Sequence, residues 1–252
     1  MILTIDVGNT NILAVLMDED VVVCEKRYDT GKNKDYNYHF KVLQKLTKNH
    51  MDELESVVIS SVVPEINKHL KKACEMLTGS APLVLNAKLN TGMTICYDYP
   101  EKLGSDLIAG AMGALAKYTP PLIMIDIGTA TTFSVISEKR EYLGGMIAPG
   151  PYTALNALAS AASQLPVTDL GFTDKVIGTN TLECMSIGAF TAHAAMIDGM
   201  IDKVVDKMGV KDITIVATGG PAKDITDMCK HKIYCEKYLL NYGLIELHKL
   251  NK

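Results

Sequence analysis

Clustered cysteines are absent from this sequence, although it contains six cysteines. Zinc sites and disulfide frameworks need paired or regularly spaced cysteines, and no C-x-x-C pair occurs. Several of the six lie in apolar runs, such as "VVVC" at residues 21–24. Cysteines in this setting are typical of buried free thiols, so we expect a reducing compartment.

An excess of basic residues is absent as well, because 25 Lys and Arg face 29 Asp and Glu, for a net charge of −4. This balance excludes the electrostatic footprint of a protein that binds nucleic acid or an anionic membrane. The chain starts directly on a strand-like run without a signal peptide, and no apolar run is long enough to cross a membrane. We therefore expect a cytoplasmic protein with neither nucleic-acid nor membrane partners.

The two common nucleotide-binding loops are also missing. The pattern G-x-x-x-x-G-K-[ST] does not occur, and no G-x-G-x-x-G follows a strand-like run. A P-loop kinase and a dinucleotide-binding domain are thus excluded. An anionic ligand would have to be held by another local site, together with a metal ion.

What is present is a regular alternation of strand-like and helix-like segments. The chain has 252 residues, of which 48% are hydrophobic and 21% charged, which is typical of globular proteins and sufficient for one large or two modest domains. The alternation predicts the α/β class.

Each half of the chain follows the same plan, with three strand-like runs before helices that alternate with strands. In the first half we expect strands at 2–9, 11–17, 20–28, 56–63 and 82–87 and helices at 35–50 and 64–77. In the second half we expect strands at 121–128, 131–138, 140–147 and 213–220 and helices at 152–163, 181–208 and 237–250. The repetition predicts an internal duplication, with domains at 1–117 and 118–252 and a ligand cleft between them.

One motif occurs at the head of both halves. "IDVGNTN" at 5–11 and "IDIGTATT" at 125–132 each place Asp-x-Gly at the end of a strand. Such an Asp can hold a hydrated metal ion, and the Gly lets a phosphate approach backbone N–H groups. Asn9, Thr10 and Thr129 add donors for phosphate oxygens. A single copy would be better explained as an ordinary hairpin turn, but two copies at equivalent places favour a nucleotide site.

The paired motif resembles the superfamily of actin, hexokinase, acetate kinase and the heat-shock chaperone ATPases, and within it type III pantothenate kinase. The likeness covers almost the whole chain, and it implies two duplicated ribonuclease H-like domains with ATP bound in the cleft between them. The segments that carry it are "DVGNTN" (6–11), "YDYPEKLGSD" (97–106), "DIGTATT" (126–132), "GGMIAPG" (144–150), "GTNTLECMSIG" (178–188), "TGG" (218–220) and "YLLNYGL" (238–244).

The resemblance also implies roles for individual residues on the ATP side. Asp6 would lie near Mg²⁺, directly or through water, and Asp126 would bind a monovalent cation, K⁺ or NH₄⁺. Thr129 would contact ATP. The first ATP-phosphate loop would consist of Asp6, Val7, Gly8, Asn9, Thr10, Asn11, Ile12 and Leu13.

On the acceptor side the resemblance implies that Asp106 is the general base for the pantothenate hydroxyl. Tyr97, Gly104, Ser105, Asp106 and Leu107 would line the pantothenate pocket, and Thr181 would complete it from the neighbouring subunit of a homodimer. From the residues alone, Asp106 could equally be the N-cap of the apolar helix at 107–118. Thr181 could likewise be a first-turn residue beside an Asn180 cap with Glu183, and His193 is most simply a packed core histidine.

The sequence departs from the family pattern at two places. Leu107 stands where family members usually have Arg after Gly-x-Asp, and "AASQLP" at 161–166 lacks an Arg and a Thr. An Arg beside the catalytic carboxylate would be a fixed positive charge that Leu cannot replace.

The two Asp-x-Gly motifs and Asp106 lead to the first hypothesis, an ATP-dependent kinase that phosphorylates pantothenate, the first step of coenzyme A biosynthesis. A kinase for a related hydroxy acid or amide and a non-catalytic, nucleotide-binding regulatory relative are the alternatives.

Overall fold

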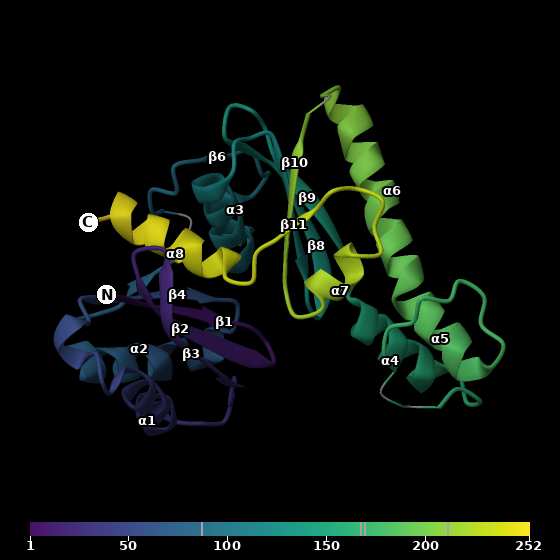
Figure 1. Cartoon of the computed structure of the whole chain (residues 1–252). Helices are drawn as coiled ribbons and strands as arrows, with labels where there is room; N and C mark the ends of the chain where they lie inside the picture. The colour runs from purple at the N-terminus through teal and green to yellow at the C-terminus, as the bar shows by residue number, and fades with distance from the viewer. Residues whose placement is uncertain (87, 167, 169, 211) are drawn as a thin grey trace. The chain divides into compact units, whose positions relative to one another are not determined.

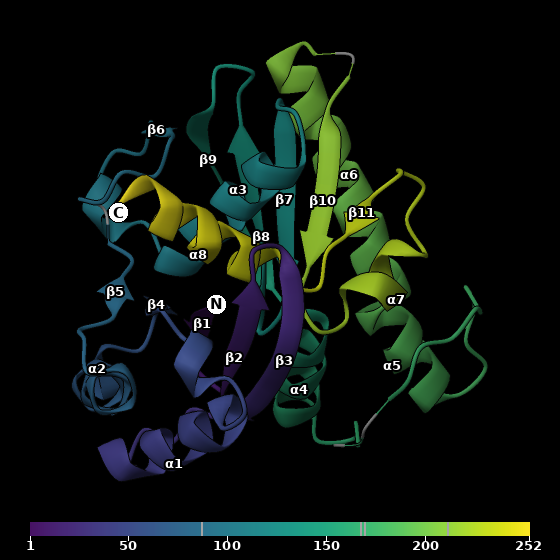
Figure 2. The same cartoon turned by 60° about the vertical axis from the view of Figure 1, so that its left-hand side comes forward.

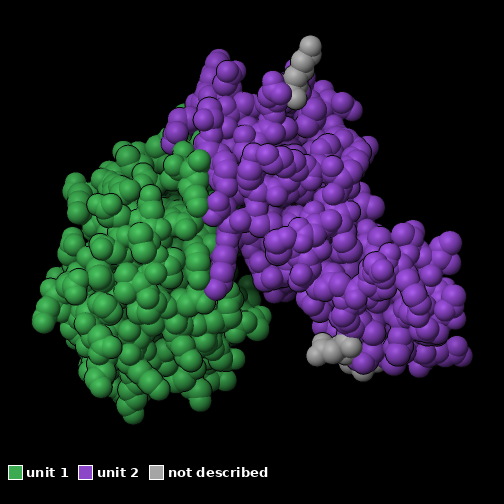
Figure 3. Space-filling view, in the orientation of Figure 1, with its two compact units in different colours: residues 1–117, 238–252 green, residues 118–237 purple. Residues whose placement is uncertain are grey.

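A computed structural model of the chain describes residues 1–86, 88–166, 168, 170–210 and 212–252. The chain forms two compact units, which Figure 3 distinguishes by colour. Unit 1 consists of Met1–Lys117 together with Tyr238–Lys252, and unit 2 of Tyr118–Lys237. The last segment thus belongs to unit 1, whereas the sequence placed it in a second domain that ended at residue 252. The physical reason is that the final helix packs against a helix and two strands of unit 1.

Unit 1 is built on a sheet with the strand order β3-β2-β1-β4-β5. Its strands are β1 (Ile2–Val7), β2 (Asn11–Asp18), β3 (Val21–Asp29), β4 (Ser56–Ser61) and β5 (Leu83–Val84). Strands β1, β2 and β3 form an antiparallel meander, and β4 and β5 add to it in parallel. The predicted meander and the strand at 56–63 are confirmed. The strand predicted at 82–87 is much shorter, and its last residue lies outside the described residues.

Helices cover both faces of this sheet (Figures 1 and 2). They are α1 (Tyr36–Thr47), α2 (Pro64–Thr78), α3 (Ser105–Lys117) and α8 (Leu239–Leu250), with short 3-10 turns at Met51–Glu53 and Pro100–Lys102. Leu3 and Ile5 of β1 pack in one core with side chains of α1 and α2. Successive residues of a strand point to opposite faces, so alternate residues of β2, such as Val15, pack on the other side with Ile245 of α8. This two-sided burial explains why β2 is apolar along nearly its whole length.

The return of α8 to unit 1 depends on its close contact with α3. A Cβ atom at Gly243 of α8 would overlap the backbone carbonyl of Ala109 in α3, so the two helix backbones touch there. Asn241 of α8 also donates a hydrogen bond from Nδ2 to Thr4 Oγ1 of β1 at 3.0 Å, in the interior of the unit. These contacts join residues more than 100 positions apart, and no local sequence pattern signals them.

Unit 2 repeats the topology of unit 1, with the strand order β11-β10-β7-β8-β9. Its strands are β7 (Leu122–Ile127), β8 (Ala130–Ile136), β9 (Glu141–Pro149), β10 (Thr214–Thr218) and β11 (Tyr234–Cys235). Strands β7, β8 and β9 again form an antiparallel meander, and β10 and β11 add to it in parallel. The predicted α/β class and the predicted duplication are confirmed by this match.

The helices of unit 2 pack on one face of its sheet around a single core cluster. They are α4 (Pro151–Ala161), α5 (Thr181–Ala189), α6 (Thr191–Met208) and α7 (Ala222–Thr226). The single helix predicted at 181–208 is thus interrupted at Phe190, which lies between α5 and α6 with φ −109° and ψ −56°. The Phe190 side chain is fully buried, with its ring centroid 4.3 Å from that of Phe172. Packing of this ring accounts for the break, which the helical pattern of the sequence does not show.

By length and composition, Thr181–Met208 does qualify as a candidate membrane span, so the expectation that no apolar run is long enough was wrong. Of the most apolar 18 residues of this segment, 44% are buried inside the protein. Ile197 and Ile201 of α6 belong to the core of unit 2. This burial is typical of a core helix.

Candidate active site

The first Asp-x-Gly turn is a hairpin between β1 and β2 that is braced from β3. The Gly8 N–H donates to the Asn11 carbonyl at 3.0 Å, which closes the turn. Thr30, just after β3, donates from Oγ1 to the Gly8 carbonyl at 2.7 Å and from its N–H to the Thr10 carbonyl at 3.0 Å. The turn is therefore held in one conformation, as a preformed phosphate site requires.

The residues predicted for the first ATP loop divide into two groups. The side chains of Asn9, Thr10 and Asn11 are exposed, and Asp6 and Gly8 are half-buried. Those of Val7, Ile12 and Leu13 are buried in the cores of unit 1. Only the exposed and half-buried residues can face a ligand. The buried residues support the turn by packing in the cores of unit 1.

Asp6 lies where the carboxyl ends of two neighbouring strands, β1 and β4, meet. In the parallel pair β1–β4, Asp6 is in register with Ser60 and Val7 with Ser61. The carboxyl ends of both strands thus meet at one edge, the usual place for ligands in α/β sheets. Helix α3, which carries Asp106, begins at the same edge, because Ser105 bonds the backbone of Ser61.

Asp106 is the second residue of α3 and is half-buried. Its Oδ1 accepts a hydrogen bond from the Leu107 N–H at 2.8 Å. Burial of the carboxyl raises the pKa of Asp106, and hydrogen bonds from backbone N–H groups oppose that effect. A carboxylate with a raised pKa is a stronger base, which suits a group that accepts a hydroxyl proton. Asp106 is not the N-cap of α3, because it lies inside the first turn and an N-cap residue precedes the helix.

The neighbours of Asp106 explain part of the Gly-x-Asp pattern. A Cβ atom at Gly104 would collide with Asp106 Oδ1, so a larger residue there would require the carboxyl to move. Leu107 is half-buried, and among the described residues no Lys, Arg or His forms an ion pair with Asp106. Tyr97, in the loop before the turn at Pro100–Lys102, is 42% exposed. Within the described residues, no ion pair of Asp106 thus takes the place of the Arg that the family pattern has at position 107.

The second Asp-x-Gly turn joins β7 to β8 in unit 2. The Gly128 N–H donates to the Ala130 carbonyl at 2.9 Å, and both the Gly150 N–H and Thr153 Oγ1 donate to the Thr129 carbonyl, at 2.9 and 2.7 Å. Thr129 is exposed and Asp126 half-buried.

Two further glycine motifs of the sequence converge on this turn. A Cβ atom at Gly150, the last residue of "GGMIAPG", would overlap the Gly128 carbonyl. A Cβ atom at Gly219 of "TGG" would overlap the backbone of Ile127, and its φ of +107° is one that residues with side chains rarely adopt. These glycines let three chain segments meet beside the turn that carries Asp126.

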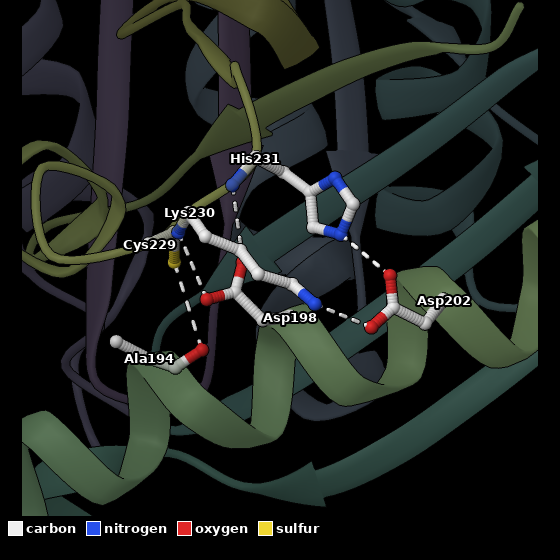
Figure 4. A network of polar contacts seen from close by, with 6 residues as sticks. All are labelled: Ala194, Asp198, Asp202, Cys229, Lys230 and His231. Carbon is white, nitrogen blue, oxygen red and sulfur yellow. Dashed lines mark hydrogen bonds and ion pairs between the residues drawn. The ribbon is translucent and has the colours of Figure 1, made fainter.

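The chain that follows Gly219 is attached to α6 by a polar network (Figure 4). Asp198 accepts hydrogen bonds from the backbone N–H groups of Lys230 at 2.9 Å and His231 at 3.3 Å. Asp202, one turn further along α6, contacts Lys230 Nζ at 2.6 Å and His231 Nε2 at 2.8 Å. The side-chain contacts with Lys230 and His231 lower the pKa of Asp202. No local sequence pattern signals this network, since its members lie about thirty residues apart.

Thr181 is the first residue of α5 and is exposed. It lines an apolar cavity of about 350 Å³ between α4 and α5, together with Leu158 and Cys184. Asn180 caps the helix by accepting a hydrogen bond from the Glu183 N–H at 3.0 Å, which confirms the predicted cap. His193 is buried, with Nε2 2.9 Å from Thr131 Oγ1, which confirms that it is a packed core histidine.

No group of three or more His, Cys, Asp or Glu side chains that could enclose a metal ion occurs within the described ranges. Asp6 and Asp126 each offer a carboxylate beside a glycine turn. Oxygen donors of this kind fit hard cations such as Mg²⁺, which usually take only one or two protein carboxylates and complete their shell with water and phosphate oxygens.

Comparison with solved structures shows the class to which this fold belongs. A Campylobacter jejuni protein described as a Baf family transcriptional activator aligns with a TM-score of 0.60 at 20% identity, over 98% of this chain and 97% of that chain. A ROK family glucokinase from Streptomyces griseus, solved with glucose and AMPPNP, aligns with a TM-score of 0.56 at 12% identity, over 99% of both chains. At these identities the likeness establishes the fold, which is that of the actin- and hexokinase-like ATPases, as expected.

Sequence comparison gives the family within that class. The family model for type III pantothenate kinase matches residues 2–203. A type III pantothenate kinase from an Exiguobacterium species is 34% identical over 255 residues, which cover 100% of both chains. The chain belongs to the type III pantothenate kinase family, which confirms the resemblance found in the sequence.

Proposed function

We propose that the protein transfers the γ-phosphoryl group of ATP to the primary hydroxyl of pantothenate, the first step of coenzyme A biosynthesis. The observation that carries the proposal is family membership over the full chain, combined with two carboxylates, Asp6 and Asp106, at one edge of the unit 1 sheet. Phosphoryl transfer needs mainly positioning and neutralisation of charge, with one group to accept the proton.

In the proposed reaction Asp106 accepts the proton of the pantothenate hydroxyl. The hydroxyl oxygen forms a bond to the γ-phosphorus while the bond from that phosphorus to the bridging oxygen breaks, which releases ADP. The raised pKa of Asp106 and its place beside the Gly104 turn support this role. Tyr97, Gly104, Ser105 and Leu107 would line the acceptor pocket.

The two glycine turns would share the binding of ATP. The braced turn at Asp6–Leu13 would offer Gly8 and the exposed donors Asn9, Thr10 and Asn11 to phosphate oxygens, with Asp6 toward Mg²⁺. The second turn would offer Thr129 to ATP and Asp126 to a monovalent cation, K⁺ or NH₄⁺. In this proposal the bound cations neutralise the negative charge that develops on the phosphates. The protein as a whole does not supply positive charge, because its net charge is −4.

We further propose a homodimer in the cytoplasm, in which Thr181 reaches the acceptor pocket of the neighbouring subunit. The support is that Thr181 is exposed at the start of a capped helix, beside exposed apolar residues such as Leu182. Sedimentation analysis of the protein would test the dimer, and a Thr181→Ala variant with an unchanged Michaelis constant for pantothenate would refute the role of Thr181.

A coupled assay of ADP release tests the reaction. ADP release should depend on pantothenate, Mg²⁺ and K⁺, and Asp106→Asn should abolish it without unfolding the protein. ADP release that does not rise on addition of pantothenate would refute pantothenate as the acceptor.

A kinase for a related hydroxy acid or amide is the second candidate, and Leu107 favours it because an uncharged side chain stands where the family pattern has an Arg. A screen of hydroxylated acceptors separates the two. The non-catalytic regulatory alternative is disfavoured, since Asp6, Asp106, Asp126 and Thr129 are all present. It would gain support if ATP bound tightly and no acceptor gave turnover.

A further inference from the structure

Ser105 lies beside the candidate base, but its hydroxyl faces β4. Its Oγ accepts a hydrogen bond from the Ser61 N–H at 3.0 Å and donates one to the Ser61 carbonyl at 3.0 Å. It also accepts a hydrogen bond from Ser60 Oγ at 3.2 Å. The Ser60 side chain is fully buried, so its hydroxyl is shielded from bulk solvent. These three contacts form a latch between α3 and the end of β4.

The latch uses the whole hydrogen-bonding capacity of the Ser105 hydroxyl. A serine hydroxyl has one proton to donate and two lone pairs to accept. Here the proton goes to the Ser61 carbonyl, and the lone pairs take Ser61 N–H and Ser60 O–H. No capacity is left for a substrate atom. The Ser105 hydroxyl therefore fastens the first turn of α3 to β4 and is not available for a hydrogen bond to a ligand.

The latch connects the two carboxylates of the unit 1 edge. Ser60 is in register with Asp6 on the adjacent strand, and Ser105 directly precedes Asp106. The hydrogen bonds thus fix the first turn of α3 to the strand that lies next to Asp6. The rest of α3 is held separately, by its backbone contact with α8 at Gly243.

We propose that Ser105 is a positioning residue of the kinase reaction, which holds Asp106 at a set place relative to Asp6 by bonding the end of β4. This inference rests on the proposed function of Asp106 as the base. Without the hydroxyl, the first turn of α3 loses its attachment and the Asp106 carboxyl moves relative to the reacting hydroxyl. A displacement of about 1 Å at a reacting group can cost about 100-fold in rate.

The test compares Ser105→Ala with two matched variants of the full chain. Ser105→Thr keeps the hydroxyl, and Ser134→Ala removes another buried serine hydroxyl, one that pairs with Tyr142 in unit 2 at 2.9 Å. We expect Ser105→Ala to lower kcat for pantothenate by about 10- to 100-fold, with a Michaelis constant for ATP changed less than about threefold. Ser105→Thr should restore most of kcat, and Ser134→Ala should leave it near the wild-type value.

Two further readouts separate positioning from loss of folding. The acidic limb of the kcat–pH profile should move to lower pH in Ser105→Ala, since a freed carboxyl is better hydrated and titrates lower. Amide exchange at Leu107 and Ile108 should accelerate in Ser105→Ala and not in Ser134→Ala. A kcat and pH profile equal to wild type in Ser105→Ala would overturn the proposal, as would an equal loss in Ser134→Ala.

Failure of the proposed function gives a different result. If the wild-type protein phosphorylates no acceptor, the kinase assignment is wrong, and amide exchange still tests the latch. Unchanged exchange at Leu107 and Ile108 would then refute the latch as well.

Discussion

Replacement of Gly243 by Ala should destabilise unit 1, because α3 and α8 touch through their backbones at this glycine. The added Cβ would overlap the Ala109 carbonyl, which is part of a helix and cannot rotate away as a side chain would. Overpacking of a tight contact costs about 3 kcal/mol at the upper end of its usual range. Alanine recovers about 1 kcal/mol through its better helix propensity. The net expected loss is therefore about 2 kcal/mol.

Gly199→Ala is the matched control for this prediction. Gly199 lies inside α6, and a Cβ there would meet no described atom within 4 Å. The same substitution should thus stabilise the protein by about 0.5–1 kcal/mol. Thermal unfolding followed by circular dichroism measures both. For Gly243→Ala we expect a midpoint lower by about 4–8 °C, given 2–4 °C per kcal/mol for a protein of this size. A Gly243→Ala midpoint at or above that of Gly199→Ala would refute the inferred backbone contact.

Three other perturbations have defined outcomes. Gly104→Ala should displace the Asp106 carboxyl and lower kcat by about 10-fold or more while the unfolding midpoint changes little, and an unchanged kcat would contradict the assigned clash. His39 is fully buried, neither ring nitrogen has a hydrogen-bond partner among the described residues, and burial lowers its pKa. The folded state therefore binds fewer protons than the unfolded chain, so stability should be complete above about pH 6.5 and fall below it. Urea unfolding of His39→Phe should show a weaker loss between pH 7 and pH 5 than wild type, and equal losses would count against this source of acid sensitivity. Asp202→Asn should release the segment at 229–231 from α6, which would accelerate amide exchange at Lys230 and His231. In the wild type the same release should occur only as pH falls through the lowered pKa of Asp202. Protection equal to wild type in Asp202→Asn would show that Asp198 alone holds the segment.

Local patterns were sufficient for the parts of the fold that are formed by neighbours in sequence. The two hairpins that carry Asp6 and Asp126 could be predicted, because apolar strands ending in Asp-x-Gly specify both the strand and its turn. The cap at Asn180 could be predicted for the same reason.

Contacts between distant segments could not be predicted in this way. The closing helix reads as an ordinary amphipathic helix, and nothing within it shows that Gly243 meets Ala109 of α3. The break at Phe190 follows from ring packing across the unit 2 core, against a continuous helical pattern. The latch of Ser105 joins residues more than forty positions apart. The sequence does show a pair of serines, Ser60 and Ser61, at the end of an apolar strand. Their role as hydrogen-bond partners becomes visible only when the fold places the start of α3 beside them.

The central claim is that this chain phosphorylates pantothenate with Asp106 as the base. Mass spectrometry of a reaction with ATP, Mg²⁺, K⁺ and pantothenate tests it most directly, when run in parallel with wild type and Asp106→Asn. We expect one phosphopantothenate for each ADP with the wild type and none above background with Asp106→Asn. ADP formed without phosphopantothenate, or equal product from both proteins, would contradict it.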